Sequence, residues 1–237
     1  MTSLHPVYLQ VRDQLWHWVT STNLPSQARL PAERELAQRF NTTRVTLRQA
    51  LGQLEAEGRI YRSNRRGWFV TPARLSYEPS RDLGFNHYVT EQGFVPDTET
   101  LSKTLTEAPR WLAERSSISV GEPIYHILRR RFVSGRCVLV EHNYVNPEKC
   151  PGLLQQDTDQ SLWGILRDAY QLVPAEREIE VCSQALGAEE AGILNVHQGS
   201  TGLYLERLCY DESGEFMEFD REYWLHDAIK LRVKISG

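Results

Sequence analysis

The chain has 237 residues, of which 41% are hydrophobic and 24% are charged, and its formal net charge at pH 7 is −4. This composition is typical of a globular protein with one or two domains. No apolar stretch approaches the ~20 residues that a membrane-spanning helix needs, and the N-terminus carries no export signal, so we expect a cytoplasmic protein with no membrane partner.

The cysteines are spread widely along the chain, at Cys137, Cys150, Cys182 and Cys209. They form no CxxC pair, and no pair of histidines lies near them at zinc-ligand spacing. We therefore expect reduced thiols, no structural metal and no cofactor.

Charge is distributed unevenly between the two ends of the chain. Residues 1–74 contain 11 Arg, no Lys and 5 acidic residues, a balance of +6, whereas residues 75–237 carry a balance of −10. A basic segment joined to an acidic one indicates a nucleic-acid-binding module attached to a part that does not bind nucleic acid. A solvated arginine-rich surface is the alternative.

Three apolar stripes near the N-terminus predict three helices. In residues 6–19 and again in residues 31–40, apolar side chains recur every three or four positions. A brief turn follows at residues 41–42, and Thr43 then begins a third helix, which carries leucines at helical spacing and ends at Gly58. This order predicts a helix-turn-helix, although a plain three-helix bundle would show the same stripes.

The first turns of the third helix carry hydrogen-bond donors rather than a mixture of charges, namely Thr43, Arg44, Thr46 and Arg48. This is the part of a recognition helix that enters the major groove of DNA. Arginine can bind guanine O6 and N7 together, and threonine can reach a phosphate or a thymine methyl group. The pattern therefore predicts a DNA-reading helix.

Residues 60–70 predict two short strands around a turn that contains Asn64 and Gly67, with Arg62, Arg65 and Arg66 along it. Such a basic wing contacts the phosphate backbone or the minor groove and adds affinity more than sequence choice.

The stretch LPAERELAQRFNTTRVTLRQALGQLEAEGRIYRSNRRGWFV, residues 30–70, together with HPVYLQV at residues 5–11, resembles the DNA-binding domain of the GntR regulators. The resemblance implies a winged helix-turn-helix and assigns DNA contacts to Arg34, Thr43, Arg44, Thr46, Arg48 and Gly67. Charge leads us to add Arg66. Many family members have a small or hydroxyl residue after the wing glycine, whereas this chain has Trp68.

Residues 73–79 contain little periodicity and mark the change of charge, so we place a linker there, between a DNA-binding domain at residues 1–72 and a second domain at residues 80–237. In the second domain, residues 122–133 and 136–145 flank Ser134-Gly135 as a hairpin, and residues 201–211 and 215–225 form another. Short helical stretches at residues 160–170 and 188–195 intervene. The expected fold class is α+β with an antiparallel sheet, and no phosphate-binding glycine loop occurs.

The motifs RRRF (129–132), VEHNY (140–144), PGL (151–153), SLW (161–163) and MEF (217–219) resemble the UTRA effector domain of the HutC-type branch of GntR regulators. That resemblance implies a chorismate-lyase-like sheet that binds a small ligand without chemistry. Two arginines would meet the anionic group of the ligand, and alternation along a strand places both on one face. An ion-pair stripe on the surface is the alternative.

By the same resemblance, a wider set of residues contacts the ligand. It consists of the arginine pair Arg129 and Arg131; the hydrogen-bonding residues Glu141, Ser161 and Glu218; a closing loop at Phe85 and Asn86; and Trp163 and Trp224, where the family commonly has tyrosine. Because indole is only a donor, the ligand can differ from the phosphosugar-type effectors.

A narrower resemblance, to regulators of phosphonate utilisation, rests on FNTTR (40–44), RRGWFVTP (65–72) and EYWLHD (222–227). A phosphonate would suit the arginine pair.

These expectations combine into one functional prediction, a homodimeric transcription repressor that binds a palindromic double-stranded DNA operator and is released by a small anionic effector. A phosphonate, a phosphosugar and a carboxylate are the candidate effector classes. The main alternative is an enzyme that acts on a small acid and carries its own winged-helix regulator, but no recognisable catalytic motif supports it. A third interpretation, in which the winged helix binds protein, does not explain the donors on the third helix.

Overall fold

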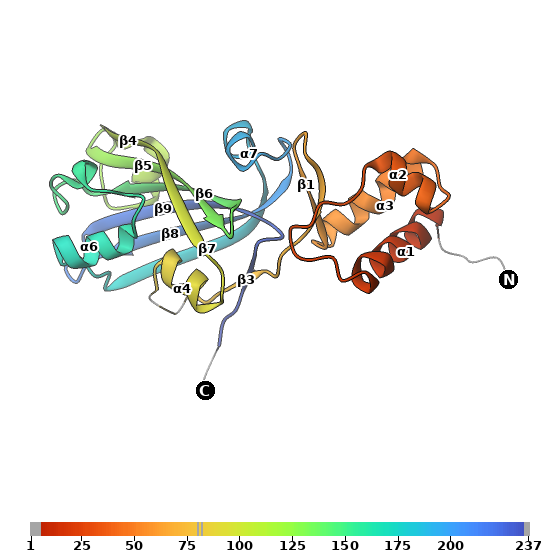
Figure 1. The fold of residues 1–237 in the computed structure, drawn as a ribbon. Coiled ribbons are helices and arrows are strands. Elements are labelled where there is room, and N and C mark those ends of the chain that lie inside the picture. Colours follow the sequence, from red (N-terminus) through yellow and green to blue (C-terminus); the bar gives the residue numbers. More distant parts are fainter. Residues whose placement is uncertain (1–5, 80, 82, 235–237) are drawn as a thin grey trace. The chain divides into compact units, whose positions relative to one another are not determined.

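The computed structural model describes residues 6–79, 81 and 83–234. The chain divides into two compact units, residues 1–74 and residues 75–237 (Figure 1). None of the described helices is long and apolar enough to cross a membrane.

The first unit contains three helices followed by a hairpin, as the sequence predicts. Val11, Leu15 and Val19 form the buried stripe of the first helix, and the leucines of the third pack against it. The Thr43 side chain caps the third helix by accepting a hydrogen bond from the Thr46 N–H. The elements are α1 (Val7–Ser21), α2 (Glu33–Arg39), α3 (Arg44–Ala56), β1 (Ile60–Ser63) and β2 (Gly67–Val70).

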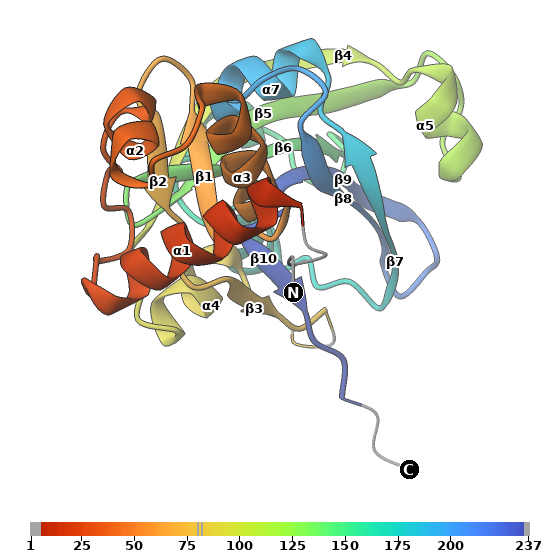
Figure 2. The ribbon, with the colours of Figure 1, turned by 90° about the vertical axis from the view of Figure 1, so that its right-hand side faces the viewer.

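The second unit is built on a six-stranded antiparallel sheet with the strand order β4-β5-β6-β9-β8-β7. Figure 2 shows β7 running steeply across the direction of β4 and β5, as expected when the twist between neighbouring strands accumulates. The strands are β4 (Pro96–Glu107), β5 (Pro123–Val133), β6 (Arg136–Val145), β7 (Glu176–Ala185), β8 (Thr201–Tyr210) and β9 (Phe216–Leu225). The predicted α+β class is therefore confirmed.

Helices cover both faces of this sheet, and α4 and α7 lie on opposite sides of it in Figure 1. Helix α6 packs its Leu162 and Leu166 against Ile127 of β5, on the face that also carries α4. Helix α5 packs against Phe219, on the other face. The helices are α4 (Phe85–Glu91), α5 (Arg110–Arg115), α6 (Leu162–Tyr170) and α7 (Ala188–Leu194), and a 3-10 turn spans Leu153–Gln155.

Two predictions differ from the structure. Strand β3 (Leu75–Tyr77) lies within the predicted linker and pairs in parallel with β10 (Ile229–Leu231), near the other end of the unit. The expected loop at Phe85 and Asn86 is instead the start of α4, whose Phe85 and Val89 are buried in the core. Ser80, the predicted start of the second domain, lies outside the described residues.

Candidate functional sites

The start of α3 gathers four of the residues expected to contact DNA. Arg34, Thr43, Arg44 and Thr46 line one open hollow, to which α2 and the preceding turn also contribute. The Thr43 and Thr46 hydroxyl oxygens lie 3.0 Å apart, so the two side chains hold each other in place. Arg34, Thr43 and Arg44 are exposed and Thr46 is half-buried. Together they present hydrogen-bond donors and positive charge on one surface.

Arg48 lies one turn further along α3 and is held by an acid. Its Nε donates to Glu33 Oε2 at 2.7 Å, and the Trp68 indole N–H donates to the other oxygen of Glu33 at 3.2 Å. Burial alone would raise the pKa of Glu33, but the hydrogen bonds from Arg48 and Trp68 lower it below its ordinary value. A network of α2, α3 and the wing therefore positions the Arg48 side chain.

The wing turns at residues 64–66 and leaves Arg66 exposed. Gly67 has a φ of +102°, a conformation that favours glycine. The unusual Trp68 points into the core of the unit and is only 6% exposed. The large side chain at this position therefore does not occupy the exposed tip of the wing.

In the second unit, a cavity lies between the sheet and the start of α4 and α6, with an empty volume of about 750 Å³ that includes space open to solvent. Most of the residues that the sequence assigns to the ligand line it: Phe85, Arg129, Arg131, Glu141, Ser161, Trp163 and Glu218.

Arg129 and Arg131 lie on the same face of β5, and both bind one oxygen of Glu141 on β6. Arg129 Nη2 donates to Glu141 Oε2 at 2.6 Å, and Arg131 Nε and Nη2 donate to the same oxygen at 2.9 and 2.7 Å. Arg129 also donates to Asn143 and to the Thr158 carbonyl. An internal carboxylate therefore already lies between the two guanidinium groups.

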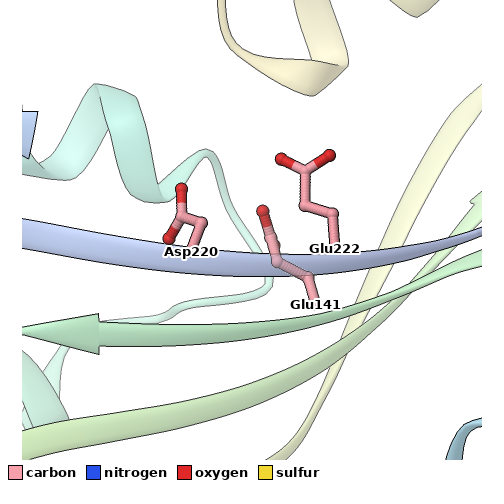
Figure 3. A group of neighbouring side chains, drawn as sticks. All are labelled: Glu141, Asp220 and Glu222. Carbon is pink, nitrogen blue, oxygen red and sulfur yellow. The ribbon is translucent and has the colours of Figure 1, made fainter. Parts of the chain in front are cut away.

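Two further carboxylates, which the sequence reasoning missed, join Glu141 in the floor of the cavity. Asp220 and Glu222 of β9 project from the sheet on the same side as Glu141 (Figure 3). Arg207 of β8 donates from Nη2 to Asp220 at 2.7 Å and to Glu222 at 2.9 Å. Alternation along β9 from Glu218 was the signal that could have identified both residues.

The ionisation of these acids differs according to their partners. Burial raises the pKa of Glu222 to about 7, with Arg207 opposing the shift and Glu141 adding to it. Burial and the neighbouring Asp220 raise the pKa of Glu218 well above its ordinary value. Although burial opposes the change, Arg129 and Arg131 lower the pKa of Glu141 to about 2. The guanidinium pair thus keeps Glu141 charged.

Oxygens of Glu141, Asp220 and Glu222 all lie within 4.8 Å of one another, a spacing that could suit a metal ion. However, guanidinium groups of Arg129, Arg131 and Arg207 donate to these carboxylates. A divalent cation would have to displace those arginines, so the donor set fits ion pairs better than a metal.

Two residues assigned to the ligand do not line the cavity. Trp224 is fully buried in the core, where its indole N–H donates to Glu222 Oε2 at 2.7 Å. Asn86 lies on α4 with its side-chain oxygen buried and without a hydrogen-bond partner among the described residues. In this structure Trp224 therefore acts on the cavity through Glu222 rather than by touching its contents.

The family model of the UTRA domain matches residues 91–230, and that of the gntR family of bacterial regulatory proteins matches residues 7–70. The chain is 29% identical to the uncharacterized HTH-type transcriptional regulator YihL of Escherichia coli K12, over 94% of this chain and 95% of YihL. It is 27% identical to the HTH-type transcriptional repressor NagR of Bacillus subtilis, over 94% of this chain and 91% of NagR.

Solved structures with a similar fold include PhnF from Mycobacterium smegmatis, with a TM-score of 0.67 and 23% identity over 96% of this chain and 99% of PhnF. YydK from Bacillus subtilis has a TM-score of 0.60 and 19% identity over 98% of this chain and all of YydK. At these identities the likeness establishes the fold alone.

Proposed function

Because this chain belongs to the gntR family of bacterial regulatory proteins and is a transcriptional regulator with a UTRA domain, we propose that it represses transcription and is released from DNA by a small anionic effector. Its relative NagR is named a repressor. Its predicted location is the cytoplasm, where bacterial DNA lies.

The observation that carries the DNA-binding half of the proposal is the exposed hollow at the start of α3, which combines Arg34, Thr43, Arg44 and Thr46. One winged helix reads few base pairs, so the proposed regulator is a homodimer on a palindromic operator with half-sites about one DNA turn apart.

The effector half rests on the cavity of the second unit. Arg131 is 5% exposed, and its Nη1 has no hydrogen-bond partner in the described part of the chain, which leaves a charged donor for a ligand anion. A phosphonate, a phosphosugar or a carboxylate would suit this donor. The effector reduces operator affinity by binding more tightly to the DNA-incompetent arrangement of the dimer.

We propose no catalysed reaction. Glu141, Asp220 and Glu222 are each engaged by arginine donors, so they serve as hydrogen-bond acceptors and counter-charges in a binding site. Incubation of the purified protein with a bound effector should return it unchanged, and turnover would favour the enzyme alternative.

Operator selection from a random duplex library, followed by affinity measurement at fixed salt, tests the DNA-binding half. Arg44→Ala should weaken operator binding roughly tenfold to a hundredfold, as expected for loss of a bidentate base contact. Arg110→Ala, which removes an exposed arginine of the second unit, is the matched control and should leave affinity unchanged. Equal affinity of the Arg44→Ala protein and the wild type would contradict the assignment.

A thermal-shift screen of phosphonates, phosphosugars and small carboxylates tests the effector half, because a ligand that binds only the folded protein must raise its melting temperature. An active compound should also lower operator affinity. A compound that stabilises the protein and leaves operator affinity intact would contradict the proposed release.

A further inference from the structure

The charges on the floor of the cavity are separated by strand. On the β5 side, Arg129 and Arg131 share the single carboxylate Glu141. On the β9 side, three carboxylates face the cavity, and Arg207 is the arginine that binds two of them, Asp220 and Glu222. Two more arginines line the cavity, Arg81, which is paired with Glu91, and Arg177 of β7. The β9 side therefore has three carboxylates for two arginines, whereas the β5 side has two arginines for one carboxylate.

The third acid of β9, Glu218, makes no ion pair in the described part of the chain, although it lines the cavity. Arg131 Nη1 likewise has no hydrogen-bond partner there, although Arg131 is 95% buried. Glu218 shares a hydrogen bond with a second acid, Asp220, and the Arg131 guanidinium lies over the Phe85 ring. Among the described residues, a cationic donor without a hydrogen-bond acceptor and an acid without a cationic partner therefore line the same cavity. Because β6 lies between β5 and β9, the two strands are roughly 10 Å apart. Arg131 binds Glu141, which is in register with Glu222, and Glu218 lies four residues further along β9.

We propose that the effector is a zwitterion, whose anionic group binds Arg131 and whose ammonium group binds among Glu218, Asp220 and Glu222. This inference rests on the proposed function, because it specifies the ligand of the same cavity. A purely anionic ligand would satisfy Arg131 but would leave the three acids of β9 with two arginines, Arg177 and Arg207. An ammonium group supplies both the missing charge and three hydrogen-bond donors.

Ionisation of the acids supports this assignment. Burial raises the pKa of both Glu218 and Glu222, with Asp220 and Glu141 adding to the shift and Arg207 opposing it. A buried carboxyl group without enough positive charge around it retains its proton. An ammonium group bound there favours the charged carboxylates, so binding of the zwitterion should release protons.

The test compares ω-aminoalkylphosphonates with two to five methylenes against alkylphosphonates of the same lengths, and ω-amino carboxylates against the matching alkyl carboxylates. Calorimetry with the full-length protein gives the affinities. At the best length, we expect the amine to tighten binding roughly tenfold or more, as a charge-assisted hydrogen bond to a buried acid would. Repetition of the carboxylate pairs in buffers of different ionisation enthalpy should reveal proton release for the amines only, because a carboxylate, unlike a phosphonate, has no titrating proton of its own near pH 7.

Glu218→Gln should remove most of the preference for the amine while retaining the affinity for alkylphosphonate. Glu212→Gln changes the same side chain in an exposed turn and should behave as the wild type. Urea unfolding and operator binding without ligand verify that each variant is folded.

Each outcome has a defined consequence. Equal or tighter binding of the alkyl analogue at every length, or a preference for the amine that survives Glu218→Gln, overturns the zwitterion while an anionic effector stands. Absence of binding by every compound overturns both ligand assignments. Loss of operator binding by the wild-type protein would instead refute the proposed regulator.

Discussion

The pH dependence of stability tests the carboxylate cluster of β9, and Glu222→Gln is the change that isolates it. Glu222 is 5% exposed, and burial raises its pKa from an ordinary value of 4.5 to about 7. Between these two values the folded protein binds more protons than the unfolded chain, so this group makes stability fall as pH rises. The loss is roughly 1.4 kcal/mol per pH unit, or roughly 3 kcal/mol across the window.

Glutamine removes this titration. The free energy of unfolding of the variant, minus that of the wild type, should therefore increase by roughly 2–3 kcal/mol from pH 5 to pH 8. The hydrogen bond that glutamine loses to Arg207 or Trp224 shifts this difference by a constant and leaves its slope unchanged. His142, whose pKa burial lowers to about 4, titrates in both proteins and cancels.

Urea unfolding at several pH values, followed through the same transition in both proteins, measures this difference. Glu212→Gln, on an exposed turn, is the control and should follow the wild type at every pH. A difference between Glu222→Gln and wild type that stays constant from pH 5 to pH 8 would refute the reasoning.

Three further predictions concern packing and reactivity. A Cβ at position 84 would lie 2.9 Å from Ser161 Oγ, so Gly84→Ala should lower the free energy of unfolding by about 1–3 kcal/mol. In a double-mutant cycle, Ser161→Ala in the same protein should recover part of that loss. Additive effects of the two changes would contradict the contact. Trp68→Phe should lower the free energy of unfolding of the first unit by about 1–3 kcal/mol, because Glu33 loses a hydrogen-bond donor and the core loses side-chain volume. An unchanged midpoint of urea unfolding would argue against this role of Trp68. Cys182 is the exposed thiol and should react with iodoacetamide before the buried cysteines in the native protein, as peptide mass mapping can show; equal rates would contradict the burial.

The helices of the first unit could be predicted because they depend on local patterns. The spacing of Leu47, Ala50, Leu51 and Leu54 defines the buried face of α3, and Thr43 marks its start through a cap that involves residues three apart. The resemblance of this region to the GntR regulators, and of the second unit to the UTRA domain, is confirmed by the family models.

The second unit was predicted less completely. The β5–β6 hairpin was evident from Ser134 and Gly135, which both adopt a positive φ in the turn. Strand β4 was missed because it lies at the sheet edge, where Thr98 is its only buried residue and the alternation of apolar side chains is absent. Likewise, β3 could not be predicted, since its partner β10 lies more than 150 residues away in the chain.

By itself, the sequence determined the family, the helix-turn-helix and the placement of Arg129 and Arg131 on one strand face, because each depends on periodicity or on a short motif. Only the tertiary structure decided what faces those arginines. The register of β5 with β6 sets Arg129 opposite Glu141, and the register of β6 with β9 sets Glu141 opposite Glu222. Neighbours across strands depend on register between distant segments, which the alternation along one strand does not specify.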